Sequence, residues 1–425
     1  MKLSSYLSRL PNDQKLLTFR NAQYTNLDLF ERVEDLKKNS LIKSSDTVVL
    51  KGLNPFDLII SIIALDGLVK KIYFLPDNFP LDSVEHSVLI DKDLTPLRVS
   101  ENKSNSTSVT QWVLFTSGTT GTPKMIFHSF ESLSFSCKRY DGCRPQFVWI
   151  LSYDVKRFAG LQVVLQSLLS GSNLFIPDDF SFESILNCIL ENEPNCISCT
   201  PSFFRKLLFS KDFQEMSFVQ ITLGGEIVDE TLLSLISSKF PTSRLIHIYA
   251  STEAGVGFSV KDKRAGFPKA WLENSDLAPV TMKISSKSTL LLRPRVKAKG
   301  DEISKRSKDD FIDTMDIVQI VKDRVFFLGR ENGAINIGGN KIHPEEVEEV
   351  IRRFPDTIEV KVYGKPSSIL GQILVADIVL KIDKKNAVYD LKKFCLKSLP
   401  NWKVPSIFKI VSNIELSSAG KIQRL

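Results

Sequence analysis

The sequence is poor in the residues that most often form disulfide bonds and metal sites. It contains 6 cysteines and 4 histidines among 425 residues, and the histidines are scattered along the chain. Cysteines this sparse do not make the framework of a secreted disulfide-rich domain, so we expect a reducing compartment. Cys196 and Cys199 form a CxxC motif, but it lies in a strand-like stretch where residues three apart point to opposite faces. The sequence therefore predicts no zinc site and no catalytic triad.

Long hydrophobic runs are also absent. The longest, Leu58 to Leu65, ends at Asp66, whereas a membrane-spanning helix needs about 20 apolar residues. Residues 1–17 lack the apolar core of a signal peptide. We therefore expect a cytoplasmic protein with no membrane span.

The chain also has only a small excess of positive charge. The net charge is +7, from 56 basic and 49 acidic residues, too small and too dispersed to indicate nucleic acid binding. Most of it falls in residues 330–425. A solvated, lysine-rich surface accounts for this. The alternative is attraction to a phosphate-bearing partner, such as coenzyme A or an acidic acyl carrier protein.

The hydrophobic pattern indicates a layered α/β fold. Hydrophobic residues make up 43% and charged residues 25% of the chain, as in ordinary globular proteins, which excludes disorder and coiled coil. Residues 46–50 and 71–75 are strand-like, and residues 55–68 between them have the pattern of a buried helix. Strand, helix and strand in this order predict a parallel α/β unit. The same alternation recurs over residues 146–199.

The pattern changes near residue 330. A helix is predicted at 344–354, and strands are predicted near 359–363 and 374–382. The Gly-rich segment 329–333 is a candidate joint. We therefore predict the α/β class, with a large layered domain at 1–329 and a small mobile α+β domain at 330–425.

A loop of Thr, Ser, Gly, Pro and Lys follows the strand-like residues 112–115. Its glycines let backbone N–H groups approach an anion, its hydroxyls add donors, and its lysine supplies positive charge. Two residues separate Gly118 from Gly121, whereas a Walker loop has four between its glycines. Composition alone leaves a polar solvent-exposed turn as an alternative. The candidate polyphosphate ligands are Thr116, Ser117, Gly118, Thr119, Thr120, Gly121 and Lys124.

Five motifs in order resemble the signatures of the adenylate-forming (AMP-binding) superfamily, which includes acyl-CoA synthetases, stand-alone adenylation enzymes and luciferases. The motifs are TSGTTGTPK at 116–124, IYASTE at 248–253, TMD at 314–316, LGR at 328–330 leading to Gly338-Gly339, and SAGKIQR at 418–424. The chain is identified as a short member, because its front end is shorter than is typical of the superfamily.

The resemblance implies a role for each motif. The reaction is attack of a carboxylate on the α-phosphorus of ATP, which brings two anions together. Lys421 would stabilise the transition state, and the loop at Thr116 would hold the leaving pyrophosphate. Glu253 would bind Mg²⁺, and Asp316 with Arg330 would bind the ribose hydroxyls. The other implied nucleotide-binding residues are Gly224, Gly225, Glu226, Tyr249, Ala250, Ser251 and Thr252.

The resemblance also implies a hinge, a thiol channel and an acyl pocket. Asn332 would be the hinge about which the small domain turns, and Gly338 and Gly339 would border a pantetheine channel. Phe158 stands where amino-acid-activating members have Asp, which disfavours α-amino acids. Arg157 stands where many members have His, so it either meets a polar or anionic substrate group or is structural. Gly160 completes the candidate acyl pocket.

We therefore expect an AMP-forming acid–thiol ligase. It would use ATP and Mg²⁺ to convert a small carboxylic acid to an acyl-adenylate and then transfer the acyl group to coenzyme A. A pantetheinyl acyl carrier protein is the alternative acceptor. A non-catalytic nucleotide-binding scaffold is the alternative of another class. It is favoured by Ala250 and Met315, which replace the usual glycines, and disfavoured by the presence of Lys421.

Overall fold

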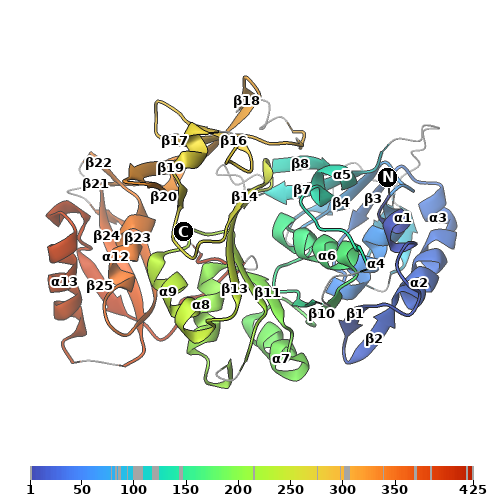
Figure 1. The fold of residues 1–425 in the computed structure, drawn as a ribbon, viewed down its shortest axis with the longest axis horizontal. Coiled ribbons are helices and arrows are strands. Elements are labelled where there is room, and N and C mark those ends of the chain that lie inside the picture. Colours follow the sequence, from blue (N-terminus) through green and yellow to red (C-terminus); the bar gives the residue numbers. More distant parts are fainter. Residues whose placement is uncertain are drawn as a thin grey trace.

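The computed structural model describes residues 2–77, 79–81, 84, 88–92, 94–98, 109–116, 124–142, 147–213, 216–274, 276–296, 298–300, 307–337, 339–367, 371–382, 385–417 and 420–423. They form three sheets of a large α/β body and a small α+β unit at one end (Figure 1). Within these ranges, no helix combines the length and the apolarity needed to cross a bilayer.

The first sheet has the strand order β6-β5-β3-β4-β7-β8. Strands β3, β4, β5 and β7 run parallel, and β6 and β8 are antiparallel edges. Helix α4 connects β3 to β4, with Pro55 at its first position and Asn54 as its cap. The strands are β3 (Thr47–Leu50), β4 (Lys71–Phe74), β5 (Val88–Ile90), β6 (Pro96–Arg98), β7 (Gln111–Thr116) and β8 (Lys124–Ser129), and α4 is Pro55–Leu65.

The second sheet has eight strands in the order β14-β13-β12-β11-β9-β10-β1-β2. Its central strands run parallel, so their carboxyl ends meet at one edge, where α/β sheets bind ligands. The strands are β1 (Lys15–Phe19), β2 (Ala22–Thr25), β9 (Val148–Ile150), β10 (Asn173–Ile176), β11 (Cys196–Cys199), β12 (Gln220–Gly224), β13 (Arg244–Ser251) and β14 (Gly255–Val260).

Helices cover these two sheets. They are α1 (Leu3–Leu7), α2 (Asn26–Lys38), α3 (Ser40–Lys43), α5 (Phe130–Ser134), α6 (Phe158–Ser170), α7 (Phe182–Asn192), α8 (Pro201–Phe209) and α9 (Glu230–Lys239), with the 3₁₀ turn η2 (Lys211–Phe213). The parallel strand–helix alternation predicted from the sequence is confirmed in both sheets.

The third sheet is antiparallel and links the large body to the small unit. Its elements are β15 (Phe267–Pro268), α10 (Ala270–Glu273), β16 (Thr281–Ile284), β17 (Thr289–Arg293), β18 (Ser307–Lys308), β19 (Phe311–Val321) and β20 (Arg324–Arg330). The 3₁₀ turn η3 (Glu331–Gly333) follows β20 directly.

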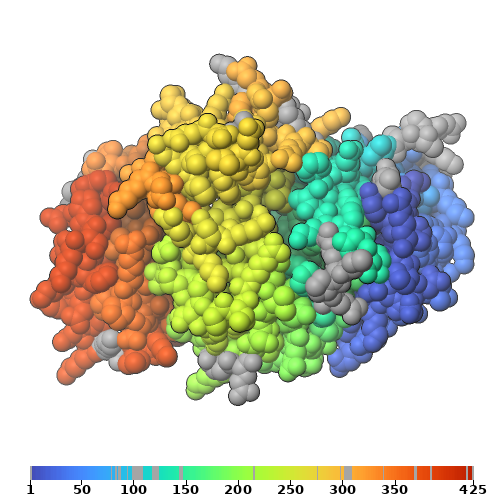
Figure 2. Space-filling model, viewed as in Figure 1, coloured from blue at the N-terminus to red at the C-terminus, as the bar shows by residue number. Residues whose placement is uncertain are grey.

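The small unit has a hydrophobic core of its own, built only from residues between Ile335 and Phe408. Its elements are β21 (Ile335–Ile337), β22 (Asn340–Ile342), α12 (Pro344–Arg352), β23 (Thr357–Ser367), β24 (Gly371–Leu380), α13 (Ala387–Ser398), η4 (Asn401–Lys403) and β25 (Ile407–Ile410). It packs against the central part of the large body at one end of the molecule (Figure 2). The chain then returns to the large body, where Leu416 contacts the core around α8 and α9.

Gly160, in the first turn of α6, lies against the chain segment that precedes this helix. A Cβ atom built on Gly160 would be 2.2 Å from the backbone oxygen of Asp154. Non-bonded atoms cannot approach this closely, so any side chain here would push the helix away from the turn.

We expect Gly160→Ala to lower the melting temperature, because overpacking of this kind costs about 1–3 kcal/mol. Thermal unfolding followed by circular dichroism measures it. Gly333→Ala is the matched control, since a Cβ atom there would come no nearer than 3.8 Å to its neighbours. Equal melting temperatures for Gly160→Ala and wild type would contradict the close packing.

Candidate active site

A large cavity of ≈ 1390 Å³ is lined by residues from all three sheets of the large body, from α12 and from the C-terminal segment. It collects most of the described residues that the sequence singled out. Those that line it are Thr116, Lys124, Arg157, Phe158, Gly224, Gly225, Glu226, Tyr249, Ala250, Ser251, Thr252, Glu253, Asp316, Arg330, Asn332 and Lys421. Gly160 and Gly339 do not line it. Ser117, Gly118, Thr119, Thr120, Gly121 and Gly338 lie outside the described residues.

The candidate phosphate loop begins and ends at the cavity. Thr116 is the last residue of β7, Lys124 is the first of β8, and the two are opposite each other in the ladder between these strands. Both line the cavity. A hydroxyl and an ammonium group, the donor types that bind phosphate, therefore stand at the two described ends of the loop.

Asp316 and Arg330 are opposite each other on neighbouring strands of the third sheet, as register partners in β19 and β20. Arg330 Nε is 3.2 Å from Asp316 Oδ1. Burial raises the pKa of Asp316, although Arg330 opposes the shift. Asp316 follows Met315, whose φ of 62° lies in the left-handed region that favours glycine. Met315 N–H donates to Asp313 Oδ1 at 2.9 Å, which helps to hold this turn.

Tyr249 supports Asp316. Its hydroxyl donates to Asp316 Oδ2, and burial, followed by the charge of Asp316, raises the pKa of the phenol. The Tyr249 ring stacks on Phe327 and Phe258, with centroids 5.0 and 5.2 Å away.

Glu253 is the candidate Mg²⁺ ligand. It lies between β13 and β14, lines the cavity, and its charge contributes to the raised pKa of Asp316. Among the described residues, no group of three or more His, Cys, Asp or Glu side chains is arranged to hold a metal ion. One carboxylate still fits Mg²⁺, which is commonly held by one or two carboxylates together with substrate phosphates and waters.

Lys421 reaches the cavity from the end of the chain. Its Cε is 3.2 Å from the position of a Cβ atom built on Gly225. Lys421 lines the cavity, and desolvation by the surrounding residues lowers its pKa. Glu226 and Asp316 oppose this shift, whereas Arg330 and Arg157 add to it. The lysine thus lies among the charged groups of the nucleotide site.

The acyl side of the cavity contains Arg157 and Phe158, at the start of α6. Arg157 Nη1 donates to the backbone oxygen of Phe115 at 3.3 Å. Phe158 is buried and its ring lies 5.7 Å from that of His128. A cation and an aromatic ring therefore stand side by side on this wall.

No motif in the sequence singles out His128. Its Nε2 is 2.8 Å from the backbone oxygen of Thr252, and its Nδ1 is 3.2 Å from Ser132 Oγ. Burial lowers the pKa of His128 to about 4, so the ring is neutral at neutral pH. A neutral ring with Nε2–H donating to Thr252 fixes the backbone directly before Glu253. Because 124 residues separate the two partners, no local pattern could have revealed the contact.

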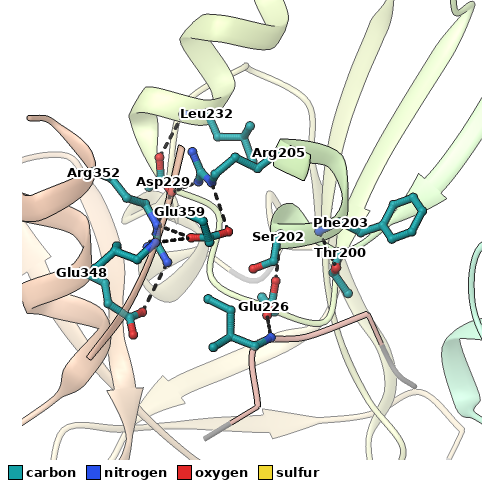
Figure 3. A network of polar contacts seen from close by, with 12 residues as sticks. Thr200, Ser202, Phe203, Arg205, Glu226, Asp229, Leu232, Glu348, Arg352 and Glu359 are labelled. Atoms are coloured by element: carbon teal, nitrogen blue, oxygen red, sulfur yellow. Dashed lines mark hydrogen bonds and ion pairs between the residues drawn. The ribbon is translucent and has the colours of Figure 1, made fainter. Parts of the chain in front are cut away.

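A network of buried charges between the large body and the small unit was not predicted from the sequence (Figure 3). Asp229, the cap of α9, is 2.5 Å from Arg205 Nη2 and 3.9 Å from Arg352 Nη1. Although burial would raise the pKa of Asp229, Arg205 and Arg352 hold it below its ordinary value. Arg205 also lies 3.7 Å from Glu359, and Arg352 lies 3.3 Å from Glu348 and from Glu359.

The candidate hinge residue lines the cavity, whereas Gly339, the described residue of the candidate thiol channel, does not. Asn332 is in η3, between β20 and the small unit, and lines the cavity. Gly339 is in the turn between β21 and β22, with φ of 89°, and a Cβ atom built there would have no neighbour within 4 Å. In this arrangement Lys421 reaches the cavity and Gly339 does not.

Comparison with known proteins gives the family. The sequence profile of the AMP-binding enzyme matches residues 43–280, over half of the chain, and the profile of the AMP-binding enzyme C-terminal domain matches residues 346–421. The chain belongs to the AMP-binding enzymes. This confirms the family expected from the five motifs.

Similar proteins include CoA ligases. A 2-succinylbenzoate–CoA ligase of Listeria innocua is 25% identical, over 98% of this chain and 96% of its own length. One of Staphylococcus aureus strain JH9 is 24% identical, over 73% of this chain and 65% of its own. This AMP-binding enzyme is therefore an AMP-forming acid–thiol ligase, as the sequence predicted.

Solved structures of adenylate-forming enzymes share the fold. An anthranilate CoA ligase in complex with anthranoyl-AMP matches with a TM-score of 0.80 and 15% identity, over 99% of this chain and 95% of its own. The o-succinylbenzoate CoA synthetase of Bacillus subtilis, in complex with its acyl-adenylate intermediate, matches with a TM-score of 0.71 and 18% identity, over 99% and 96%. The predicted fold class is confirmed.

The buried imidazole of His128 makes stability depend on pH. Its pKa is about 4 in the folded protein and near 6.5 when unfolded. Between these values the unfolded state binds more protons, so the free energy of unfolding falls as the pH drops from 6.5 to 4, by up to about 3 kcal/mol. We expect His128→Gln to flatten this part of the profile in urea unfolding. The same slope in both proteins would contradict a buried neutral ring.

Proposed function

We propose that this AMP-binding enzyme activates 2-succinylbenzoate, or a closely similar aromatic dicarboxylate, with ATP and transfers the acyl group to coenzyme A. The names of the relatives suggest the acid and the thiol. The observation that carries the proposal is that Lys421, from the end of the chain, meets Asp316, Arg330 and the ends of the phosphate loop in one cavity.

The first half-reaction follows from this arrangement. The loop from Thr116 to Lys124 would bind the β- and γ-phosphates, and Asp316 would accept hydrogen bonds from the ribose hydroxyls. Glu253 would hold Mg²⁺, which when bound lowers the charge that the attacking carboxylate meets. The ammonium group of Lys421 would offset the charge shared between the carboxylate and the α-phosphate as they approach.

Transfer to the thiol needs a different arrangement of the small unit. We propose that residues 330–425 turn about Asn332, which withdraws Lys421 and brings Gly339 towards the cavity. Domain closure and rotation of this kind commonly turn on a few residues that absorb the change in φ and ψ. The arrangement with Lys421 in the cavity suits adenylation, because the lysine lies among the nucleotide-site charges.

The acyl wall fits an acid with a second anionic group. Arg157 lines the cavity, and a guanidinium can bind a carboxylate with two parallel hydrogen bonds. Phe158, beside it, supplies an apolar surface for an aromatic ring and no anion for an α-ammonium group. 2-Succinylbenzoate, with an aromatic ring and two carboxylates, matches both features.

Coenzyme A is the acceptor we propose, since the relatives reported above are CoA ligases. A carrier protein remains the alternative that would use the basic small unit. A non-catalytic scaffold would have no use for a lysine placed among nucleotide-site charges. We place the reaction in the cytoplasm, where ATP, coenzyme A and reduced cysteines coexist.

The central test is pyrophosphate exchange with ATP and 2-succinylbenzoate. We expect exchange in the wild type and at least a roughly 100-fold loss in Lys421→Ala, because an electrostatic contact made in the transition state is removed. Benzoate, which lacks the second carboxylate, should be a poor substrate. If Lys421→Ala exchanges pyrophosphate as fast as the wild type, the mechanism is refuted. If exchange occurs with benzoate but not with 2-succinylbenzoate, the proposed acid is refuted.

We also expect Asp316→Ala to weaken ATP binding about 10- to 100-fold, because hydrogen bonds to a charged group contribute about 1.5–3 kcal/mol. Isothermal titration calorimetry with a non-hydrolysable ATP analogue measures the affinity. Asp323→Ala is the control, since Asp323 lies in the turn at the far end of the same hairpin and pairs with Arg264 on the surface. Equal affinities for the Asp316 and Asp323 variants would contradict the ribose assignment.

A further inference from the structure

The peptide groups on both sides of Lys421 are hydrogen-bonded to the large body. The hydroxyl of Thr200 donates to the backbone oxygen of Gly420. The backbone N–H of Ile422 donates to Glu226 Oε1 at 3.1 Å. The main chain is thus held immediately before and immediately after the lysine, by two residues that lie about 200 positions away in the sequence.

Both of these partners are fixed at the start of α8 (Figure 3). Thr200 is the cap of this helix, and its Oγ1 accepts from Phe203 N–H at 3.1 Å. Glu226 Oε2 accepts from Ser202 N–H at 3.0 Å. The first turn of a helix offers N–H groups that have no partner within the helix, so it provides a rigid base for both contacts.

The described residues on either side of positions 418–419 are bonded to one another. Ser417 N–H donates to the backbone oxygen of Lys421 at 2.7 Å, and Gly420 N–H donates to that of Ser417 at 2.8 Å. Leu416 and Ile422 form an antiparallel bridge across the turn. Gly420 has φ of 68°, a conformation that suits glycine. These bonds hold residues 417 and 420–422 together, and the hydrogen bonds to Thr200 and Glu226, with the packing of Leu416 on the core around α8 and α9, place Lys421 at the cavity.

We propose that Thr200 and Glu226 are positioning residues for adenylation: they clasp the backbone around Lys421 and release it for thioester formation. This inference rests on the proposed function, because it assigns the clasp to one of that function's two half-reactions. Neither contact is compatible with a small unit that has turned away and withdrawn the lysine. The clasp therefore acts only in the first half-reaction.

Isosteric variants separate the clasp from packing. Glu226→Gln keeps the shape but replaces one acceptor oxygen by an NH₂ group, so it can accept from Ile422 N–H or from Ser202 N–H but not from both. Thr200→Val keeps the shape and loses the hydroxyl, whereas Thr200→Ser retains it. Ser181→Ala is the matched control: it removes a side-chain cap from α7, a helix that does not line the cavity.

The experiment measures the two half-reactions separately. Pyrophosphate exchange with ATP and 2-succinylbenzoate reports adenylation, and the reaction of preformed 2-succinylbenzoyl-adenylate with coenzyme A reports transfer. We expect Thr200→Val to slow pyrophosphate exchange about 10- to 100-fold and to change transfer by no more than about twofold. Glu226→Gln should slow pyrophosphate exchange more than it slows transfer. Thr200→Ser should restore exchange, and Ser181→Ala should affect neither step. Equal losses in both steps, or no loss in exchange, would overturn the proposal.

Hydrogen exchange of the segment 416–423 tests the clasp without any substrate. We expect its amides to exchange faster in Glu226→Gln and Thr200→Val than in wild type or Ser181→Ala, because the outward contacts are lost. Unchanged protection would overturn the clasp even if the enzyme uses a different acid. The wild type could instead show no pyrophosphate exchange with any acid while the hydrogen-exchange protection responds as expected. In that case the proposed function fails and the docking of the segment stands.

Discussion

The arrangement of the two parts of this enzyme depends on the buried charges between them. Asp229 of the large body lies between Arg205, from the same body, and Arg352 of the small unit, and Glu359 contacts both arginines. Removing one member would leave another charge buried and unpaired, which costs about 3–5 kcal/mol. The interface is therefore made or broken as a whole. Arg205 lies on α8, the helix that Thr200 caps, so the same helix contributes to the interface and to the contact beside Lys421.

The fold was predictable wherever short apolar runs end at polar or turn residues. Strands β10 and β11 lie within the strand–helix alternation predicted over residues 146–199. Helix α4 stops at Leu65, three residues before the predicted end, because Asp66 turns its side chain to Leu3 N–H and to Trp112 Nε1. Strand β1 joins the eight-stranded sheet beside β10, some 155 residues further along the chain. Such long-range contacts leave no periodic signal in the sequence.

Site residues that belong to a short motif were predictable from the sequence, whereas contacts between residues far apart in the chain were not. The cross-strand pair Asp316–Arg330 falls within two motifs, and its register brings the charges together. His128 and Thr200 act through single contacts with backbone oxygens far along the chain. Met315, by contrast, was recognisable from the sequence as a replacement for the usual glycine. The structure gives the reason for that glycine, because the φ of Met315 is positive. A non-glycine residue in this conformation costs about 1–2 kcal/mol.

Charged groups of both signs act on Lys421. Without substrate, Glu226 and Asp316 attract the ammonium group, while Arg157 and Arg330 repel it. Triphosphate and carboxylate bring negative charge to the same place, which draws all three cations inward and competes with the two carboxylates for Lys421. Glu226 also holds the backbone of the lysine-bearing turn through Ile422 N–H. The incoming anions thus compete with Glu226 for the charge of Lys421, while Glu226 still holds the adjacent backbone.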